Sequence, residues 1–166
     1  MERFKTASPR FFALIIDGLV FVLFIYFESF FLIPEMPVPI VFTGLIIHYF
    51  CAHFYNIYLH AVYGQTLGKM ALKIKVLDVS ESPVSFRQAI LRESPGIMFS
   101  IIFLGSEMYQ VLTAGITDDF RYSFFDQMVL GVLLLWVIAE VVVMLGNEKR
   151  RSIHDLIAGT VVVRQQ

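Results

Sequence analysis

The sequence predicts an all-α integral membrane protein with four transmembrane helices, short cytoplasmic interfacial turns and a small two-stranded cytoplasmic sheet. The first observation is composition: 57% of the 166 residues are apolar and only 16% are charged, whereas soluble domains are about half apolar and a quarter charged. One small core cannot bury this much apolar surface, so the surplus is expected to face lipid. The second observation is a set of four long apolar segments, and the third is the uneven distribution of Lys and Arg. Together they predict a single membrane domain over residues 1–166.

Each of the four apolar segments is close to the length that a bilayer crossing requires, roughly 20 residues. They cover residues 11–33, 39–63, 95–112 and 127–145. The first is expected to remain in the mature protein, because it exceeds the apolar length of a signal peptide and carries Asp17 and Glu28. Pro34 and Pro37 predict a tight turn between the first two helices.

The basic residues predict the orientation of these helices. Among the 13 Lys and Arg, only Arg121 falls in a connection on the opposite side from the others. Because cytoplasmic connections carry an excess of Lys and Arg, both termini are expected in the cytoplasm. The net charge of −1 favours no nucleic-acid partner, so the expected partner is the lipid bilayer.

The connection between the second and third spans has recognisable local signals. Gly64 predicts a helix end, and Lys alternating with apolar residues over 73–76 predicts a short strand after an interfacial turn. Ser85 and Gln88 have the spacing of a capping box that starts a helix leading into the third span, with a kink at Pro95.

The C-terminal tail resembles the same plan. A basic cluster is followed by a short amphipathic turn over residues 152–158 and a strand over residues 159–163. Each half of the chain is therefore expected to be a helical hairpin, a basic turn and a strand, and the two strands could pair beneath the membrane. Both halves start inside, so any repeat would be parallel rather than inverted.

Three segments resemble the RDD family of membrane proteins: residues 8–17 (SPRFFALIID), 64–69 (GQTLGK) and 153–162 (IHDLIAGTVV). The matching motif positions are Arg10, Asp17, Gly64, Thr66, Gly68, Lys69, His154 and Asp155. The resemblance covers essentially the whole chain. It implies a small multi-span protein of the bacterial cytoplasmic (inner) membrane, with mostly unassigned biochemistry and a suspected link to transport.

The first span carries a polar stripe. On an ideal helix Arg10, Asp17 and Glu28 lie within about 20° of one another. Charged groups in a span are costly and should face neighbouring helices or water. Arg10 could extend to the headgroups or pair with Asp17 through water, and the two could equally serve to lock helix packing or topology.

The second span carries a polar face with alternating spacings of four and three residues, which is expected to meet the first span. Its members are Tyr49, His53, Asn56, His60 and Tyr63. The two histidines are either proton-exchange groups or hydrogen-bonded interface residues. Their separation of seven residues is about 10 Å along a helix, too far to ligate one metal ion at about 2 Å, so no metal site is expected.

The depths of the titratable residues suggest an ion or proton relay. Asp17 and Glu140 are expected in the inner third of the bilayer, and Glu28 and Glu107 near the outer surface. His53 is expected midway, and the proposed relay comprises Asp17, Glu28, His53, His60, Glu107 and Glu140. Alternatively, Glu107 marks the end of a span, and Glu140 pairs with Arg10 or with the basic cluster at residues 149–151.

No catalytic constellation or cofactor motif is present in the sequence, so an enzyme is not expected. Residues 64–69 lack the spacing and the preceding strand of a phosphate-binding loop. Adjacent helical residues point about 100° apart, so His154 and Asp155 do not form a dyad. Asp155 is expected instead to cap a turn or to pair with a basic residue such as Lys69.

Two functions are compatible with these features. The first is a small proton-coupled transporter of a cation or solute, or a transport subunit, with Asp17 as the leading coupling residue. Four helices enclose little space, so this function predicts a homo-oligomer. The alternative is a non-catalytic partner or regulator of another membrane protein.

Overall fold

The computed structural model describes residues 2–28, 36–114 and 124–165. The long helices are α1 (Ala7–Glu28), α2 (Val38–Tyr63), α4 (Phe86–Ala114) and α5 (Phe124–Gly146). The short elements are the 3-10 helix η1 (Glu2–Phe4), α3 (Leu67–Ala71), β1 (Ile74–Asp78), α6 (Ile153–Ala158) and β2 (Thr160–Arg164).

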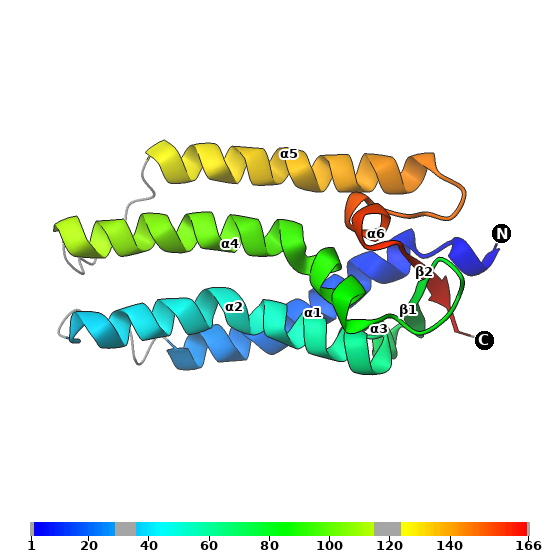
Figure 1. The fold of residues 1–166 in the computed structure, drawn as a ribbon, viewed down its shortest axis with the longest axis horizontal. Coiled ribbons are helices and arrows are strands. Elements are labelled where there is room, and N and C mark those ends of the chain that lie inside the picture. Colours follow the sequence, from blue (N-terminus) through cyan, green and yellow to red (C-terminus); the bar gives the residue numbers. More distant parts are fainter. Residues whose placement is uncertain (1, 29–35, 115–123, 166) are drawn as a thin grey trace.

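The long helices run along the long axis of the molecule, with α4 between α2 and α5 (Figure 1). The short helices, the sheet and both chain ends gather at one end (Figure 1). The molecule therefore has a helical part and a compact end built from connecting segments.

Three helices in the described part of the chain are long and apolar enough to cross a membrane, namely α2, α4 and α5. The fourth predicted span, over α1, is not confirmed. Helix α1 has 22 residues, and residues 29–33 of that predicted span lie outside the described ones. The turn at Pro34 also lies outside them, whereas Pro37 lies at the N-terminal cap of α2.

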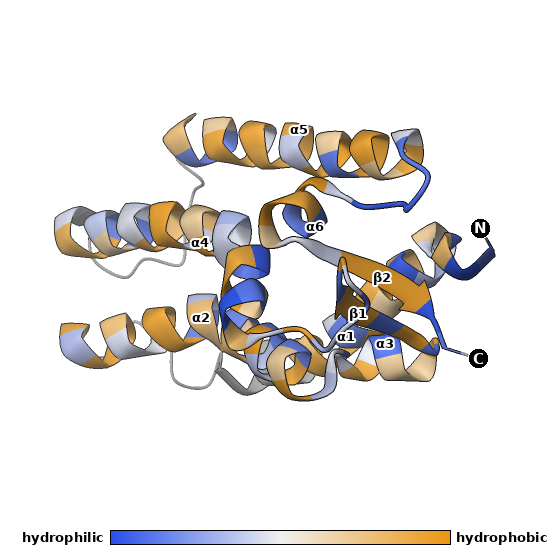
Figure 2. Cartoon of the chain, turned by 45° about the vertical axis from the view of Figure 1, so that its right-hand side comes forward, coloured by the Kyte–Doolittle hydropathy of each residue, from blue (hydrophilic) through white to orange (hydrophobic). Residues whose placement is uncertain are grey.

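Hydrophobic residues make up most of the long helices (Figure 2), and many of their large apolar side chains are exposed. Only 11% of the apolar window of each of the three spanning helices is buried within the chain. Polar residues gather at the compact end and in the first turns of α4 (Figure 2). This distribution is the reverse of a soluble bundle and fits helices surrounded by lipid.

The two predicted strands pair, as expected. Strands β1 and β2 are antiparallel, with a register that runs from Ile74 opposite Arg164 to Asp78 opposite Thr160. The order of two long helices, a short helix and a strand occurs twice along the chain. The pairing of β1 with β2 joins these two halves at the compact end.

The local signals in the connections are confirmed. Gly64 ends α2 with φ at 71°, a conformation that glycine adopts without strain. A Cβ at Gly64 would also lie 2.8 Å from the carbonyl oxygen of Val76. The Ser85 N–H and hydroxyl donate to the side-chain oxygen of Gln88, and the Gln88 backbone N–H donates to the Ser85 hydroxyl.

Proline 95 lies inside α4, which continues through it. The first turns of α4 run at an angle to the rest of the helix (Figure 1). This bend is the effect expected when proline removes a backbone donor within a helix. The third predicted span is therefore the later part of a longer helix that begins at Phe86.

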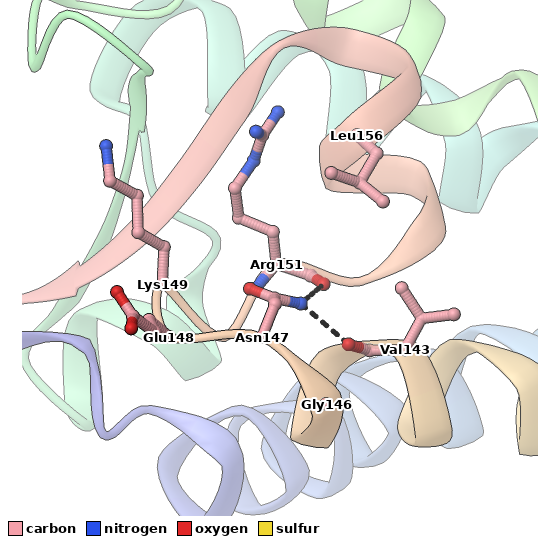
Figure 3. A pocket seen from close by; sticks show the side chains of 7 residues that line it. All are labelled: Val143, Gly146, Asn147, Glu148, Lys149, Arg151 and Leu156. Carbon is pink, nitrogen blue, oxygen red and sulfur yellow. Dashed lines mark hydrogen bonds between the residues drawn. The ribbon is translucent and has the colours of Figure 1, made fainter.

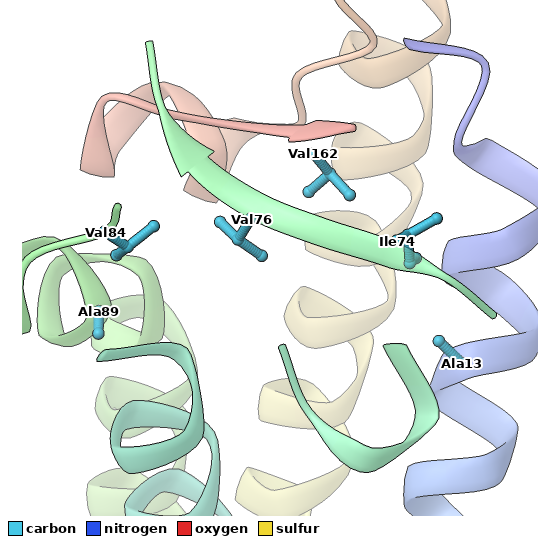
Figure 4. Packing of buried hydrophobic residues seen from close by; sticks show 6 residues of the cluster. All are labelled: Ala13, Ile74, Val76, Val84, Ala89 and Val162. Carbon is cyan, nitrogen blue, oxygen red and sulfur yellow. The ribbon is translucent and has the colours of Figure 1, made fainter. Parts of the chain in front are cut away.

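The sheet packs on a small apolar core at the compact end (Figure 4). The strand residues Ile74, Val76 and Val162 are fully buried. They pack with Ala13 of α1 and Ala89 of α4. This core attaches the sheet to the long helices and fixes where the connecting segments lie.

Candidate functional site

A group of charged and titratable side chains, all buried or half-buried, lies at this end, and we call it the charged cluster. Its members are Arg10, Asp17, His53, His60, Lys69, Arg92, Glu93, Glu140, His154 and Asp155. They come from α1, α2, α3, α4, α5 and α6. Every predicted motif residue with a charged side chain belongs to it.

The fully buried carboxylate of Asp155 binds two arginines from different helices. The Arg10 guanidinium of α1 donates to it at 2.5 Å, and the Arg92 guanidinium of α4 donates to its other oxygen. Burial alone would raise the pKa of Asp155, but the Arg92 and Arg10 guanidinium groups hold it well below its usual range. The carboxylate therefore carries a charge and ties α6 to α1 and α4.

Asp155 also caps α6. Its carboxylate accepts the Ser152 backbone N–H at 3.0 Å, which completes a capping box. The expected capping role is thus confirmed, but the basic partners are Arg10 and Arg92 rather than Lys69. Arg10 contacts Asp155 directly, and its possible pairing with Asp17 through water stays a prediction.

Glu140 of α5 contacts His154 of α6, rather than Arg10 or the basic cluster at residues 149–151. The imidazole Nδ1 lies 2.9 Å from a Glu140 oxygen, and the His154 backbone N–H donates to the other oxygen at 3.1 Å. Arg92 lies 2.9 Å from His154 Nε2, and arginine can only donate. The geometry therefore places the imidazole proton on Nδ1, facing Glu140.

Burial and the nearby Arg92 lower the pKa of His154, and Glu140 and Asp155 oppose that shift only in part. A neutral imidazole is consistent with the proton on Nδ1. His154 thus extends the contacts of Asp155 to a fourth helix, α5.

Asp17 of α1 accepts three hydrogen bonds. The donors are the Tyr55 hydroxyl at 2.8 Å, the Thr66 hydroxyl at 2.6 Å and the Gly68 N–H at 2.8 Å. These bonds join α1 to α2 and α3. Three donors match an ionised carboxylate, which only accepts.

The motif glycine Gly68 allows this approach of α3 to α1. A Cβ at this position would lie 2.1 Å from the Ala13 carbonyl oxygen. Any other side chain would push α3 away from α1 and from the Asp17 carboxylate. Thr66 and Gly68 of the GQTLGK segment therefore hold the Asp17 carboxylate in place.

The polar face of α2 meets α4, rather than α1 as predicted. His53 Nδ1 lies 3.1 Å from a carboxylate oxygen of Glu93, and Nε2 lies 2.8 Å from the Ser100 hydroxyl. Asn56 donates to the same Glu93 oxygen at 3.4 Å. Gly96 leaves room for the ring, since a Cβ there would lie 2.9 Å from His53.

Arg92 and Glu93 are missing from the sequence prediction, because both precede Pro95, where the third span was expected to begin. The capping box at Ser85 is the signal that could have found them. A helix begun there carries residues 92 and 93 directly toward the apolar segment.

Two further members of the charged cluster, His60 and Lys69, are affected by burial. His60 is 2% exposed, and neither ring nitrogen has a partner in the described part of the chain. Lys69 is partly buried, and burial and the nearby Arg92 lower its pKa to about 8, against the pull of Asp17 and Glu93.

The remaining relay candidates lie elsewhere. Glu107 is in α4, fourteen residues beyond Glu93, which is about 21 Å along a helix. The side chain of Glu28 lies outside the described part. The relay thus stays a prediction. The described residues contain no group of His, Cys, Asp and Glu arranged for a metal ion.

The fold and the charged cluster define a helical membrane protein whose ionic contacts are concentrated at one end of the bundle. Residues 5–159 match the model of the RDD family, and the chain belongs to that family. No curated protein and no solved structure matches the chain. The arginine and the two aspartates of the motif, Arg10, Asp17 and Asp155, all lie in the charged cluster.

Proposed function

We propose that this RDD protein crosses the bacterial inner membrane four times, with both termini in the cytoplasm. Arg10 at the start of α1 contacts Asp155 of α6, and the Arg164 side chain donates to the backbone of Lys5. The start of α1 therefore lies at the same end as the C-terminal strand. With 22 residues, α1 extends about 33 Å, the thickness of a bilayer core. The basic connections place that end inside.

We further propose that the protein exchanges a small cation for protons. The observation that carries this proposal is the contact between His53 and Glu93 at the interface of α2 and α4. An imidazole accepts and releases protons near neutral pH. A carboxylate binds either a proton or a cation, so a proton passed from Glu93 to His53 leaves an oxygen site for the cation.

The contacts of Asp17 support a different role from the coupling role predicted for it. Its three donors already satisfy the carboxylate, and each comes from a neighbouring element. Exchange of a proton or cation there would first have to break these bonds. We therefore assign Asp17 a positioning role, in which it holds α3 and Lys69 against α1.

Four helices are few to enclose a path for an ion, so the proposal includes self-association. A non-catalytic partner of another membrane protein stays the alternative, because such a partner requires no group that titrates.

Proton flux in liposomes tests the exchange. The purified protein is reconstituted with an internal pH dye, and sodium or potassium gradients are imposed. Wild type should change the internal pH, and Glu93→Gln should abolish the change because the neutral amide cannot exchange a proton. Glu148→Gln, an exposed acid outside the cluster, is the matched control and should retain the flux.

Unchanged flux in Glu93→Gln would remove the assignment of that residue. Asp17→Asn should lower the melting temperature along with the flux; loss of flux at an unchanged melting temperature would instead make Asp17 the coupling residue. An absence of protein-dependent flux under every gradient, with a stable partner co-purifying from native membranes, would support the alternative function.

A further inference from the structure

An open pocket lies between the end of α5 and helix α6, outside the charged cluster (Figure 3). Its volume is 580 Å³. Val143 and Leu156 provide an apolar side, and Glu148 and Lys149 provide a charged side. The pocket therefore combines the two surface types that a phospholipid presents.

The walls of the pocket are held by hydrogen bonds. The Asn147 amide donates to the carbonyl oxygens of Val143 and Arg151, both at 2.6 Å, and its oxygen accepts the Arg151 N–H at 2.8 Å (Figure 3). The Arg151 guanidinium donates to the Thr160 and Asp155 carbonyl oxygens. These bonds fix the connection between α5 and α6 in one shape.

Positive charge dominates the polar side of the pocket. Lys149 is exposed, and its side chain extends to the same side of the connection as Arg151 (Figure 3). The adjacent Arg150 donates to the Leu145 carbonyl oxygen at the end of α5. Among the residues that line the pocket, Lys149 and Arg151 against the single acid Glu148 leave a net positive charge.

The position of the pocket favours a membrane lipid as the molecule that binds in it. It lies at the end of α5, which is the most apolar of the three spanning helices, and that end falls at the bilayer surface. Leu156 is 47% exposed, so the apolar side is open to an acyl chain. A soluble anion would leave this apolar side unused.

We propose that the pocket binds one anionic phospholipid, with its phosphate on Lys149 and an acyl chain along Val143 and Leu156. The net positive side matches a headgroup of net negative charge. Bound there, the lipid bridges α5 and α6, which otherwise meet through few contacts such as that of Glu140 with His154. The proposal requires a membrane location and is independent of ion exchange.

Lipid retention tests this proposal. Wild type is purified in mild detergent from membranes that contain phosphatidylglycerol and phosphatidylethanolamine, and the retained lipids are quantified by mass spectrometry. Wild type should retain phosphatidylglycerol preferentially. Lys149→Gln should retain about five-fold less, as expected for one basic residue at a membrane surface.

Two further variants keep the test specific. Arg87→Gln removes an exposed charge elsewhere and should leave retention unchanged. Gly146→Leu adds a side chain where a Cβ meets no atom within 4 Å; it should reduce retention by filling the pocket without changing charge. Equal retention of both lipids by wild type, or equal losses in Lys149→Gln and Arg87→Gln, would overturn the proposal.

Discussion

Lys69 lies among charges of both signs. Burial disfavours its charged form, and Arg92 and Arg10 repel the ammonium group. Asp17 and Glu93 attract it. Its pKa is lowered to about 8 from an ordinary 10.5. The charged form of Lys69 therefore lowers the free energy of unfolding, although Lys69 is one of the motif residues.

This cost depends on pH in a predictable direction. Between about pH 8 and 10.5 the unfolded chain binds more protons at Lys69 than the folded chain does, so its contribution to the free energy of unfolding rises with pH. Lys69→Met should therefore gain stability over wild type below pH 8, and this gain should shrink as the pH approaches 10.5. Thermal unfolding in detergent across this window measures the gain.

Lys5→Met, at an exposed lysine, is the control for general effects of charge. A stability difference between Lys69→Met and wild type that stays constant across the window would contradict the lowered pKa.

For single residues, the sequence identified many members of the charged cluster. It did not identify which of these side chains contact one another. The motif placed Arg10 and Asp155 in the site, yet 145 positions separate them, and no helical periodicity relates residues so far apart. The pairing of His53 with Glu93 was missed because hydropathy assigned Glu93 to a connection. Spacing predicts faces within one helix, whereas contacts between helices depend on packing.

Helix α6 is an element whose place depends on one side chain. It has six residues, too few to be stable alone, and Asp155 supplies both its cap and its contacts with α1 and α4. The sequence predicted both strands and a short amphipathic turn at the position of α6, where the structure has a helix of six residues. It could not predict that α6 contacts α4, because nothing in the sequence pairs Arg92 with Asp155, 63 positions further along the chain.

Asp155→Asn should therefore detach α6 and destabilise the protein. Removing this charge leaves two guanidinium groups without their buried partner, and breaking a buried ion pair typically costs about 3–5 kcal/mol. Thermal unfolding in detergent should show a large decrease in melting temperature.

The exposed pair of Arg3 and Glu81, at 2.7 Å, provides the comparison. Glu81→Gln should change the free energy of unfolding by less than about 1 kcal/mol. Similar losses for Asp155→Asn and Glu81→Gln would show that burial of Asp155 contributes little.

The compact end of the molecule contains the start of α1, the segment between β1 and α4, and both chain ends (Figure 1). These parts are therefore expected on the same side of the membrane. In a Cys51→Ser background, Glu2→Cys and Ser80→Cys should react with a membrane-impermeant maleimide only after permeabilisation. Thr113→Cys, at the far end of α4, should react in intact spheroplasts. Labelling of Glu2→Cys from outside would show that α1 does not cross the membrane.

The pairing of β1 with β2 has a consequence for how the chain is assembled. Helix α6 and β2 follow the four long helices in chain order, so the ribosome makes Arg10 and Arg92 before Asp155. Until α6 and β2 are synthesised, the two guanidinium groups lack this carboxylate and β1 has an open edge. In a chain interrupted before residue 153, both guanidinium groups would lack the Asp155 carboxylate and β1 would lack its partner strand.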